Sequence, residues 1–209
     1  LWKFNMDWDT ELSMDLQTRW MKFYTGLKHI EQVPIPCQVW FGCKEDITIH
    51  GFCDASQEAY GACLYVRSKL NGSWSTSLYT SRSRVAPRRT MSIPRLELNA
   101  AVVLIELIST IPEMLSRLES KLTQKQITLW TDSTTVLFWI NTIVPLKTYV
   151  SNRVVQILES SSAGQWRHVP TADNPADLIS RGVSAEALVA NSFWWNGPEW
   201  LGKSSEFWP

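Results

Sequence analysis

The sequence predicts an α/β domain on a mixed five-stranded sheet, in which three antiparallel strands precede strands that pair in parallel, with helices on both faces. Two observations predict this fold. Three strand-like runs follow one another between residues 47 and 84, and helical patterns then alternate with two short β-rich runs. The expected element order is β-β-β-α-β-α-α-β-α.

The strand-like runs span residues 47–56, 59–68 and 73–84, and a Lys-Leu-Asn-Gly turn joins the last two into an antiparallel meander. Ser92 and Pro94 then open a helix that is apolar on nearly every side, as expected of a helix buried against a sheet. The remaining elements are a strand at 126–132, helices at 133–141 and 146–160, a strand at 164–170, and a last helix opened by Asn174 and Pro175.

A helical arm is expected before the sheet. Apolar residues recur every three or four positions from Thr10 to Ile30, which predicts an amphipathic helix, and Pro34 and Pro36 prevent its continuation. The chain then reads as an extended connector to residue 46. Twelve tryptophans are many for this length, and the terminal arms contain several of them, at Trp8, Trp20, Trp194 and Trp195. We expect these aromatic arms to pack onto other surfaces.

Composition excludes several classes of protein. The 209 residues include 20 Lys and Arg and 20 Asp and Glu, so nucleic-acid contact has to come from a local patch rather than an overall field. The most apolar stretch, residues 100–108, contains Glu106 and is too short to span a membrane, so we expect a soluble protein.

The cysteines form no CxxC pair and are expected to be reduced, buried thiols: Cys37, Cys43, Cys53 and Cys63. The abrupt start, without a leader-like segment, indicates a piece of a longer polypeptide.

Four acidic residues lie at the edges of predicted elements: Asp54 ends the first strand, Glu97 lies in the first turn of the apolar helix, Asp132 follows the fourth strand, and Asp177 lies in the last helix. Singly, each has a structural explanation. Asp54 could begin a turn, and Glu97 could complement the helix dipole. Asp132 could cap a helix, and Asp177 could occupy the third helical position behind an Asn174 cap. Taken together they favour a functional explanation, because the expected order of strands and helices places all four acids at one edge of the sheet.

Such a cluster predicts bound cations. Clustered carboxylates repel one another and raise one another's pKa unless a cation neutralises them, and hard divalent ions prefer oxygen ligands. Mg²⁺ is the expected ion. Two such ions, roughly 3.5 to 4 Å apart, activate a water and stabilise the leaving oxygen during in-line attack on a phosphodiester. The sequence therefore predicts nuclease chemistry.

Four strings carry a family resemblance: FCDAS, RLELNAA, WTDSTTVLFWI and WRHVPTADNPADLISRG. In order, spacing and element type they resemble the ribonuclease H domain of retroelement polymerases, and most closely that of BEL/Pao long-terminal-repeat retrotransposons. By this resemblance, residues 47–182 are a ribonuclease H-like domain. Residues 1–46 resemble the helical connection segment that follows the reverse transcriptase, and residues 183–209 resemble a Trp-rich tail leading toward integrase.

The resemblance implies a ribonuclease H-like fold, two Mg²⁺ ions for which Mn²⁺ can substitute, and hydrolysis of the RNA strand of RNA/DNA hybrids. By motif position, the metal-binding catalytic acids are Asp54, Glu97, Asp132 and Asp177. The implied partners are the hybrid and the covalently linked reverse transcriptase and integrase regions, in cytoplasmic virus-like particles or, for a domesticated copy, in the nucleus. Many relatives carry a mobile His after the fifth strand, whereas His168 precedes Val169 and Pro170 and is expected within the strand.

A local basic patch precedes the helix of Glu97 and is formed by Arg82, Arg84, Arg88, Arg89 and Arg95. The patch is predicted to bind phosphates, and a solvated basic loop is the alternative. Ser56, Asn99 and Ser133 lie beside the acids in the sequence. They are candidates for hydrogen bonds to the 2′-hydroxyls that distinguish RNA from DNA.

Two other functions are alternatives to nuclease activity. The domain could be a catalytically inactive ribonuclease H-like connector, or a nucleic-acid clamp between polymerase and integrase, although all four acids are present. The Pao region is sometimes labelled a peptidase, and an aspartic peptidase needs two Asp-Thr/Ser-Gly loops. Neither TDSTT nor FCDAS contains the glycine of such a loop, which disfavours that activity.

Overall fold

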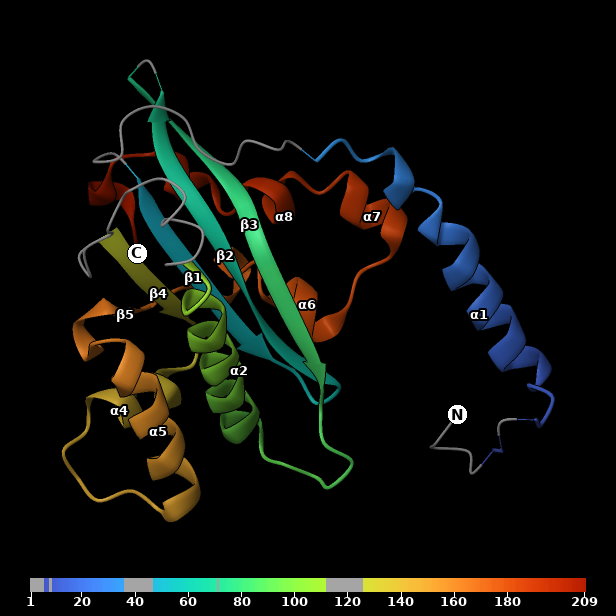
Figure 1. The fold of residues 1–209 in the computed structure, drawn as a ribbon, viewed down its shortest axis with the longest axis horizontal. Helices are drawn as coiled ribbons and strands as arrows, with labels where there is room; N and C mark the ends of the chain where they lie inside the picture. Colours follow the sequence, from blue (N-terminus) through green and yellow to red (C-terminus); the bar gives the residue numbers. More distant parts are fainter. Residues whose placement is uncertain (1–5, 8, 36–46, 71, 112–125) are drawn as a thin grey trace. The chain divides into compact units, whose positions relative to one another are not determined.

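The computed structural model describes residues 6–7, 9–35, 47–70, 72–111 and 126–209. The chain divides into two compact units, one of Leu1–Ile35 with Val183–Asn191 and one of Pro36–Gly182 with Ser192–Pro209. The second unit contains the sheet (Figure 1). The predicted order of strands and helices is confirmed along this unit.

The sheet has five strands in the order β3-β2-β1-β4-β5. β1 pairs antiparallel with β2 and parallel with β4, and β4 pairs parallel with β5. This is the predicted mixed sheet, with its three antiparallel strands first. The strands are β1 (Thr48–Ala55), β2 (Ala59–Leu70), β3 (Ser73–Val85), β4 (Ile127–Thr131) and β5 (Trp166–His168).

Alternation along β1 separates the two faces of the sheet. Ile49 and Cys53 belong to the hydrophobic core shared with the helices, whereas His50 and Phe52 contact aromatic rings of the other face. Gly51 points to the helical side, where an added Cβ would lie 2.5 Å from a methyl carbon of Leu104. The glycine therefore lets a helix approach the central strand closely.

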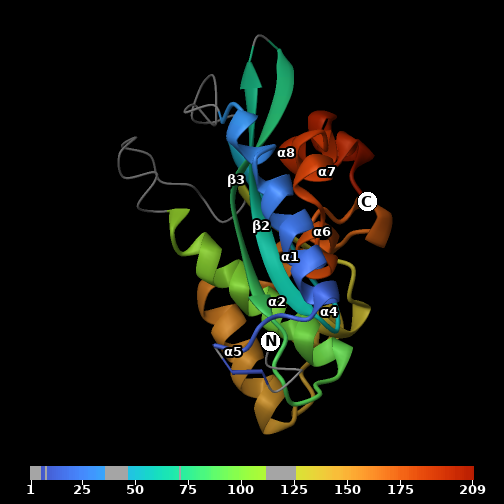
Figure 2. The same cartoon turned by 90° about the vertical axis from the view of Figure 1, so that its right-hand side faces the viewer.

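One face is covered by α2 (Ile93–Ile108), α4 (Thr134–Asn141) and α5 (Thr148–Ser160). Figure 2 shows the sheet from the side, with α2 on one side of β2 and β3 and α8 on the other. α2 contacts β1 and β2, and α5 packs on α2. Leu98 and Leu104 of α2 and Ile157 of α5 are fully buried. The apolar pattern of α2 thus has the predicted cause, since this helix lies between the sheet and a second helix.

The other face is covered by α6 (Asp177–Arg181) and by a tail with α8 (Ser192–Asn196), η7 (Glu199–Gly202) and η8 (Ser205–Phe207). The Trp200 ring lies 4.9 Å from that of Trp130, and the Trp208 ring lies 4.8 Å from that of His50. Buried Arg67 donates to the carbonyl oxygens of Leu201 at 2.6 Å and Lys203 at 2.7 Å. The aromatic tail therefore packs, as expected.

The first unit contains α1 (Met14–Leu27), η2 (Ile30–Gln32) and α7 (Ala185–Val189). The predicted helix at 10–30 is right in type but shorter at both ends, since α1 begins at Met14, ends at Leu27 and is followed by a 3₁₀ turn at Ile30–Gln32. α1 buries none of its residues, so the packing expected of this arm is not seen there. Among the described residues, no helix is both long and apolar enough to cross a membrane.

Cys53 and Cys63 are free and buried, as predicted. The predicted thiols at Cys37 and Cys43 lie outside the described residues. Ser92 occupies the predicted N-cap position of α2 without a side-chain cap hydrogen bond, and Pro94 lies in the first turn. The predicted boundaries of the strands agree with the structure to within two residues, including β5, which is two residues shorter at each end than its predicted span of 164–170.

Candidate active site

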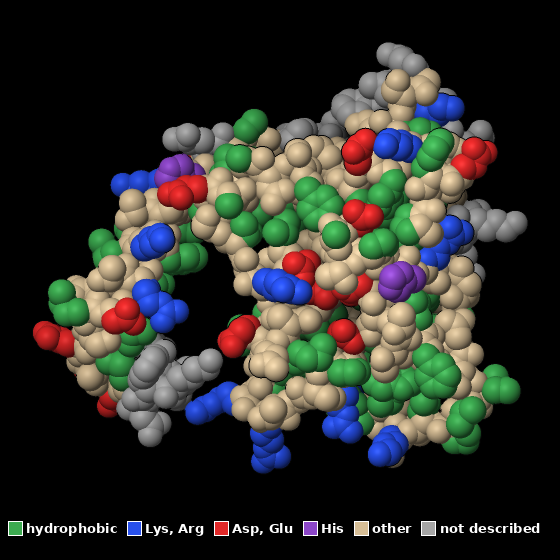
Figure 3. All heavy atoms as spheres, turned by 180° about the vertical axis from the view of Figure 1, so that it is seen from behind, with side chains coloured by type: hydrophobic (Ala, Val, Ile, Leu, Met, Phe, Trp, Pro, Cys, Tyr) green, Lys and Arg blue, Asp and Glu red, His purple; other side chains and the backbone are tan. Residues whose placement is uncertain are grey.

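The candidate site lies where β1 and β4 end. Asp54 is the second-last residue of β1, and Asp132 directly follows β4. Because these strands pair in parallel, with Cys53 opposite Thr131, their carboxyl ends meet at one edge of the sheet. Asp54 is buried, at 7% exposure, and Asp132 is half-buried. Viewed from behind, acidic side chains gather in the middle of the sheet unit, beside a Lys or Arg side chain (Figure 3).

Glu97 reaches this edge from α2. The hydroxyl of Ser133 donates to Glu97 Oε2 at 2.5 Å and accepts the Val136 N–H at 3.2 Å as the N-cap of α4. Glu97 is thus linked to the residue after Asp132. Two local predictions are corrected here. Glu97 lies beyond the first turn, because Ser92 is the N-cap and the helix begins at Ile93; and Ser133, not Asp132, caps α4.

Asp177 is the first residue of α6. The prediction that it occupies the third helical position is wrong, because the helix begins at Asp177 after an Ala176 N-cap. Asn174 caps the preceding turn instead, with its Oδ1 accepting the Ala176 N–H at 3.2 Å. One Asp177 oxygen accepts from Arg181 Nε at 2.5 Å, one helical turn later.

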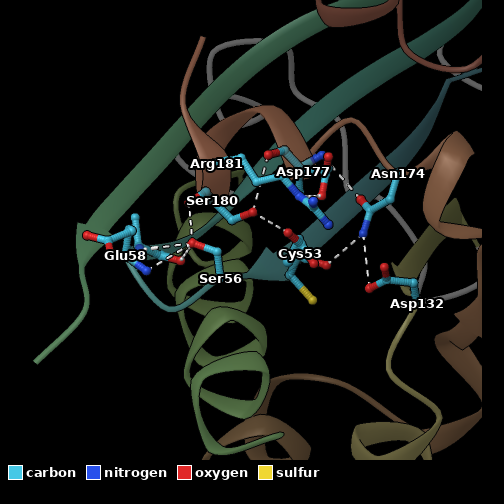
Figure 4. A network of polar contacts seen from close by, with 11 residues as sticks. Cys53, Ser56, Glu58, Asp132, Asn174, Asp177, Ser180 and Arg181 are labelled. Carbon is cyan, nitrogen blue, oxygen red and sulfur yellow. Dashed lines mark hydrogen bonds and ion pairs between the residues drawn. The ribbon is translucent and has the colours of Figure 1, made fainter. Parts of the chain in front are cut away.

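Two side chains that sequence reasoning did not assign connect these acids. Asn174 Nδ2 donates to the Cys53 carbonyl oxygen at 3.1 Å and lies 3.4 Å from Asp132 Oδ1, so it bridges β1 and the end of β4 (Figure 4). Ser180, in α6, donates its hydroxyl hydrogen to Asp54 Oδ2. The NPADLIS string contains both residues, but their role follows only from the docking of α6 on β1.

The acids form one electrostatic group. Burial, together with the charges of Asp132 and Asp177, raises the pKa of Asp54 to about 6, although hydrogen bonds from Ser180 and from the Ala55 backbone act in the opposite direction. Burial also raises the pKa of Glu97, against the hydrogen bond from Ser133, and the charge of Asp132 adds to this rise. The charge of Asp132 therefore raises the pKa of both Asp54 and Glu97, and the charge of Asp177 raises that of Asp54.

This donor set fits hard divalent cations, since it consists of partly buried carboxylates that repel one another. As the side chains lie, no group of three or more His, Cys, Asp or Glu within the described ranges is arranged to hold a metal ion. Asp54, Glu97 and Asp177 instead each accept a hydrogen bond from a neighbouring side chain. The donors therefore match a divalent cation in chemistry, and hydrogen bonds within the protein orient three of them.

The residues predicted to contact ribose hydroxyls have partners within the protein. Ser56 donates to the Ser180 carbonyl oxygen at 2.5 Å, and Ser133 donates to Glu97. Asn99 Oδ1 accepts from Tyr149 Oη at 3.0 Å and from Arg153 Nε at 2.7 Å. Contacts of these three residues with RNA stay a prediction.

The predicted basic patch is divided. Arg82 and Arg84 both pair with Glu106, at 3.1 and 2.7 Å, which neutralises part of their charge. Arg88 and Arg89 are exposed in the segment between β3 and α2, and Arg95 lies over the Tyr149 ring, 5.0 Å from its centroid. Phosphate binding by the patch stays a prediction.

Arg153 of α5 joins this region without having been predicted. Its guanidinium lies 3.5 Å from the centroid of the Tyr149 ring, one helical turn earlier. A cavity of about 410 Å³ is lined by several residues of this region, among them Arg84, Asn99, Tyr149 and Arg153. In the sequence, the four-residue spacing of Tyr149 and Arg153 within one predicted helix was the signal that could have indicated this contact. His168 ends β5 and is exposed, so its predicted place in the strand is confirmed.

Comparisons with known proteins point to one family. A family described as Pao retrotransposon-like RNaseH-like domain matches residues 1–133, a range that contains Asp54, Glu97 and Asp132. A comparison with curated protein sequences found no match.

Similar solved structures include RNase H1 of the halophilic archaeon Halobacterium salinarum, with 14% identity over 68% of this chain and 96% of that one and a TM-score of 0.36. LC11-RNase H1 in complex with an RNA/DNA hybrid has 14% identity over 68% of this chain and 99% of that one, with a TM-score of 0.43. A foamy viral protease-reverse transcriptase in complex with double-stranded DNA has 11% identity over 77% of this chain and 27% of that one, with a TM-score of 0.37.

Proposed function

The chain belongs to the family of Pao retrotransposon-like RNaseH-like domains, and we propose that it is a divalent-cation-dependent endonuclease that hydrolyses the RNA strand of RNA/DNA hybrids. One observation carries this proposal. Four acids from β1, α2, α6 and the end of β4 act on one another electrostatically at one sheet edge. A protein gains no stability from gathering like charges, so their convergence favours a role in binding cations.

Asp54, Glu97, Asp132 and Asp177 would hold two Mg²⁺ ions, with Mn²⁺ as a substitute. When bound, such ions supply the positive charge that activates a water and stabilises the leaving oxygen of a phosphodiester. The protein contributes the arrangement of the ligands. The hydroxyls of Ser180 and Ser133 would orient Asp54 and Glu97, and Asn174 would fix Asp132 relative to β1.

Substrate contacts are proposed on the side of α2. Arg88, Arg89 and Arg95 lie before and at the beginning of the helix that carries Glu97, where they would contact phosphates of the hybrid. Arg82 and Arg84 share the single negative charge of Glu106, so one positive charge of this pair is not neutralised. Arg84 would offer this positive charge to a phosphate. The ribose 2′-hydroxyls would be contacted by Ser56, Asn99 and Ser133. Each of these side chains would exchange its present hydrogen bond within the protein for one to the RNA strand.

We place this activity in a longer retrotransposon polyprotein. Residues 1–46 would be the connection to a reverse transcriptase, residues 47–182 the nuclease domain, and residues 183–209 the tail leading toward integrase. The structure groups residues 192–209 with the sheet rather than with residues 183–191. The tail would therefore complete the nuclease unit before any connection to a following domain. The reaction would take place in cytoplasmic virus-like particles or in the nucleus.

Replacing Asp132 by Asn tests the proposed function. Asp132 acts electrostatically on both Asp54 and Glu97, so D132N should lower cleavage of a labelled RNA/DNA hybrid by at least about 100-fold in Mg²⁺. Binding of the hybrid should persist, because the substitution also reduces repulsion of phosphates. Gel-resolved cleavage and fluorescence anisotropy measure the two properties separately.

Asp173→Asn is the matched control. This acid lies four residues before Asp177, and its charge is not among those that raise the pKa of Asp54 or Glu97. D173N should cleave at the parental rate. Cleavage by D132N at the parental rate would contradict the nuclease proposal. A parent chain that binds the hybrid but does not cut it in Mg²⁺ or Mn²⁺ would favour the inactive connector or clamp.

A further inference from the structure

Two serine hydroxyls join the chain segments that contain Asp54 and Asp177. Ser180 of α6 donates to Asp54 Oδ2, and Ser56, two residues after Asp54, donates to the Ser180 carbonyl oxygen at 2.5 Å (Figure 4). The two bonds run in opposite directions between the same two segments. We call Ser56 and Ser180 the serine clasp.

The Ser56 half of the clasp is fixed by the turn between β1 and β2. Its hydroxyl oxygen accepts the N–H groups of Glu58 at 3.1 Å and Ala59 at 3.2 Å. Its own N–H donates to the Ala59 carbonyl oxygen at 2.8 Å. These bonds hold Ser56 within the turn. Its hydroxyl oxygen lies 2.5 Å from the Ser180 carbonyl oxygen and 3.3 Å from that of Ala59, so the single hydroxyl hydrogen is donated to the nearer acceptor, in α6.

The Ser180 half lies on a helix that needs external support. α6 has five residues and no side-chain N-cap, so its own hydrogen bonds do not hold it in place. Ser180 is 1% exposed, and the same hydroxyl lies 3.2 Å from the Asp177 carbonyl oxygen. The Ser180 bond to Asp54 therefore also sets the position of Asp177, which begins the same helix.

We propose that the serine clasp positions Asp54 and Asp177 as ligands of a shared divalent cation, with Ser180 as the positioning residue. This inference rests on the proposed function, which supplies the cation. A carboxylate has two oxygens with about four acceptor sites, so Asp54 can accept hydrogen bonds from Ser180 and from the Ala55 backbone and still offer acceptor sites to a cation. Ligands that are ordered before the cation arrives do not lose that conformational freedom on binding.

The test measures Mn²⁺ binding to the 209-residue chain by the EPR signal of free Mn²⁺, without nucleic acid. S180A should weaken binding roughly tenfold, as expected for a lost hydrogen bond to a charged group. S56A should weaken it about threefold, because it acts through Ser180. The double variant should bind no more than about twofold more weakly than S180A, since residues that act as one unit are not additive.

Two controls separate positioning from folding. Ser161 is also buried, at 7% exposure, and its hydroxyl donates to Ile157 and accepts from Trp166 Nε1 on the helical side of the sheet. S161A should therefore match the structural cost of S180A and leave Mn²⁺ binding unchanged. S180T keeps the hydroxyl and should restore binding. Near-UV circular dichroism of the tryptophans reports whether each variant folds.

The outcomes separate this inference from the proposed function. Parental Mn²⁺ affinity in folded S180A would overturn the clasp, while hybrid cleavage by the parent chain would leave the nuclease proposal standing. Weaker binding in S180A, in a parent chain that binds Mn²⁺ but never cuts, would support the clasp and contradict the nuclease. A parent chain that does not bind Mn²⁺ would overturn both. If S180A does not fold, unchanged binding in S56A overturns the clasp.

Discussion

Asp54 carries an energetic cost that its neighbours only partly offset. It is buried, it lies within the field of two other acids, and its pKa is raised to about 6. Ser180 lowers the pKa but does not restore the ordinary value of 3.8. Below pH 3.8 both the folded and the unfolded chain hold this proton. Between pH 3.8 and about 6 the Asp54 carboxyl is protonated in the folded chain and ionised in the unfolded chain. The stability that Asp54 contributes at low pH therefore falls over this range and is lost as the pH rises through about 6.

Asp54→Asn should therefore stabilise the chain at pH 7.5 without divalent cations. The side-chain oxygen of Asn still accepts the Ser180 hydrogen bond, and the charge is gone. At roughly 1.4 kcal/mol per pKa unit, the gain in unfolding free energy should be about 1 to 3 kcal/mol. Urea unfolding, followed by tryptophan fluorescence from pH 4 to 8, measures it. A D54N chain less stable than the parent at pH 7.5 would show that the ionised Asp54 carboxylate does not destabilise the fold.

At the scale of elements, α6 reaches the site because β2 leaves room for it. A Cβ on Gly61 would lie 2.6 Å from Ile179 Cγ2 and 2.4 Å from the Arg82 carbonyl oxygen. Gly61 pairs with Asp54 across the two strands. The absence of a side chain at this position thus allows the helix of Asp177 to dock directly beside Asp54.

Gly61→Ala should move α6 and separate the acids. Overpacking at this contact should lower the unfolding free energy by about 1 to 3 kcal/mol and reduce hybrid cleavage along with it. Gly164→Ala is the control, because an added Cβ there meets nothing within 4 Å. Thermal unfolding and the cleavage assay check both variants. Equal stability and activity of G61A and the parent would contradict the proposed docking of α6.

Several elements could be predicted because their signals are local. Alternation identified β1 to β3 nearly to the residue, and the apolar run after Ser92 identified α2. The start of α6 was wrong, because Asn174 and Pro175 read as a helix cap while the chain uses them in a preceding turn. The acids could be named from the sequence, but Ser180 and Asn174 could not, since their roles depend on which strand α6 meets.

For the whole molecule, the tail is the largest feature that sequence patterns left unplaced. It covers the sheet face opposite α2 and buries Trp194 and Leu201. Tyr65 donates to the Trp194 carbonyl oxygen at 2.7 Å, and Arg67 donates to two tail carbonyls. Burial lowers the pKa of Arg67 to about 10, so this cation stays charged at neutral pH and depends on those carbonyls.

Truncation after Asn191 should therefore disrupt the sheet unit as a whole. It removes the carbonyl partners of Arg67 and exposes Phe52 and Trp130, which the tail now covers. We expect binding of a hydrophobic dye and loss of a cooperative thermal transition, together with loss of hybrid cleavage. A truncated chain that unfolds cooperatively within a few degrees of the parent would show that the tail is dispensable.

The central claim is that four acids distant in the chain form one binding site for divalent cations. Amide NMR spectra of the labelled 209-residue chain during addition of Mn²⁺ test this directly. A paramagnetic ion broadens the signals of nearby nuclei. The amide signals of Asp54, Glu97, Asp132 and Asp177 should broaden together at the same Mn²⁺ concentration, and excess Mg²⁺ should restore them. Broadening confined to one of these residues, or spread over unrelated surface acids, would contradict a shared site.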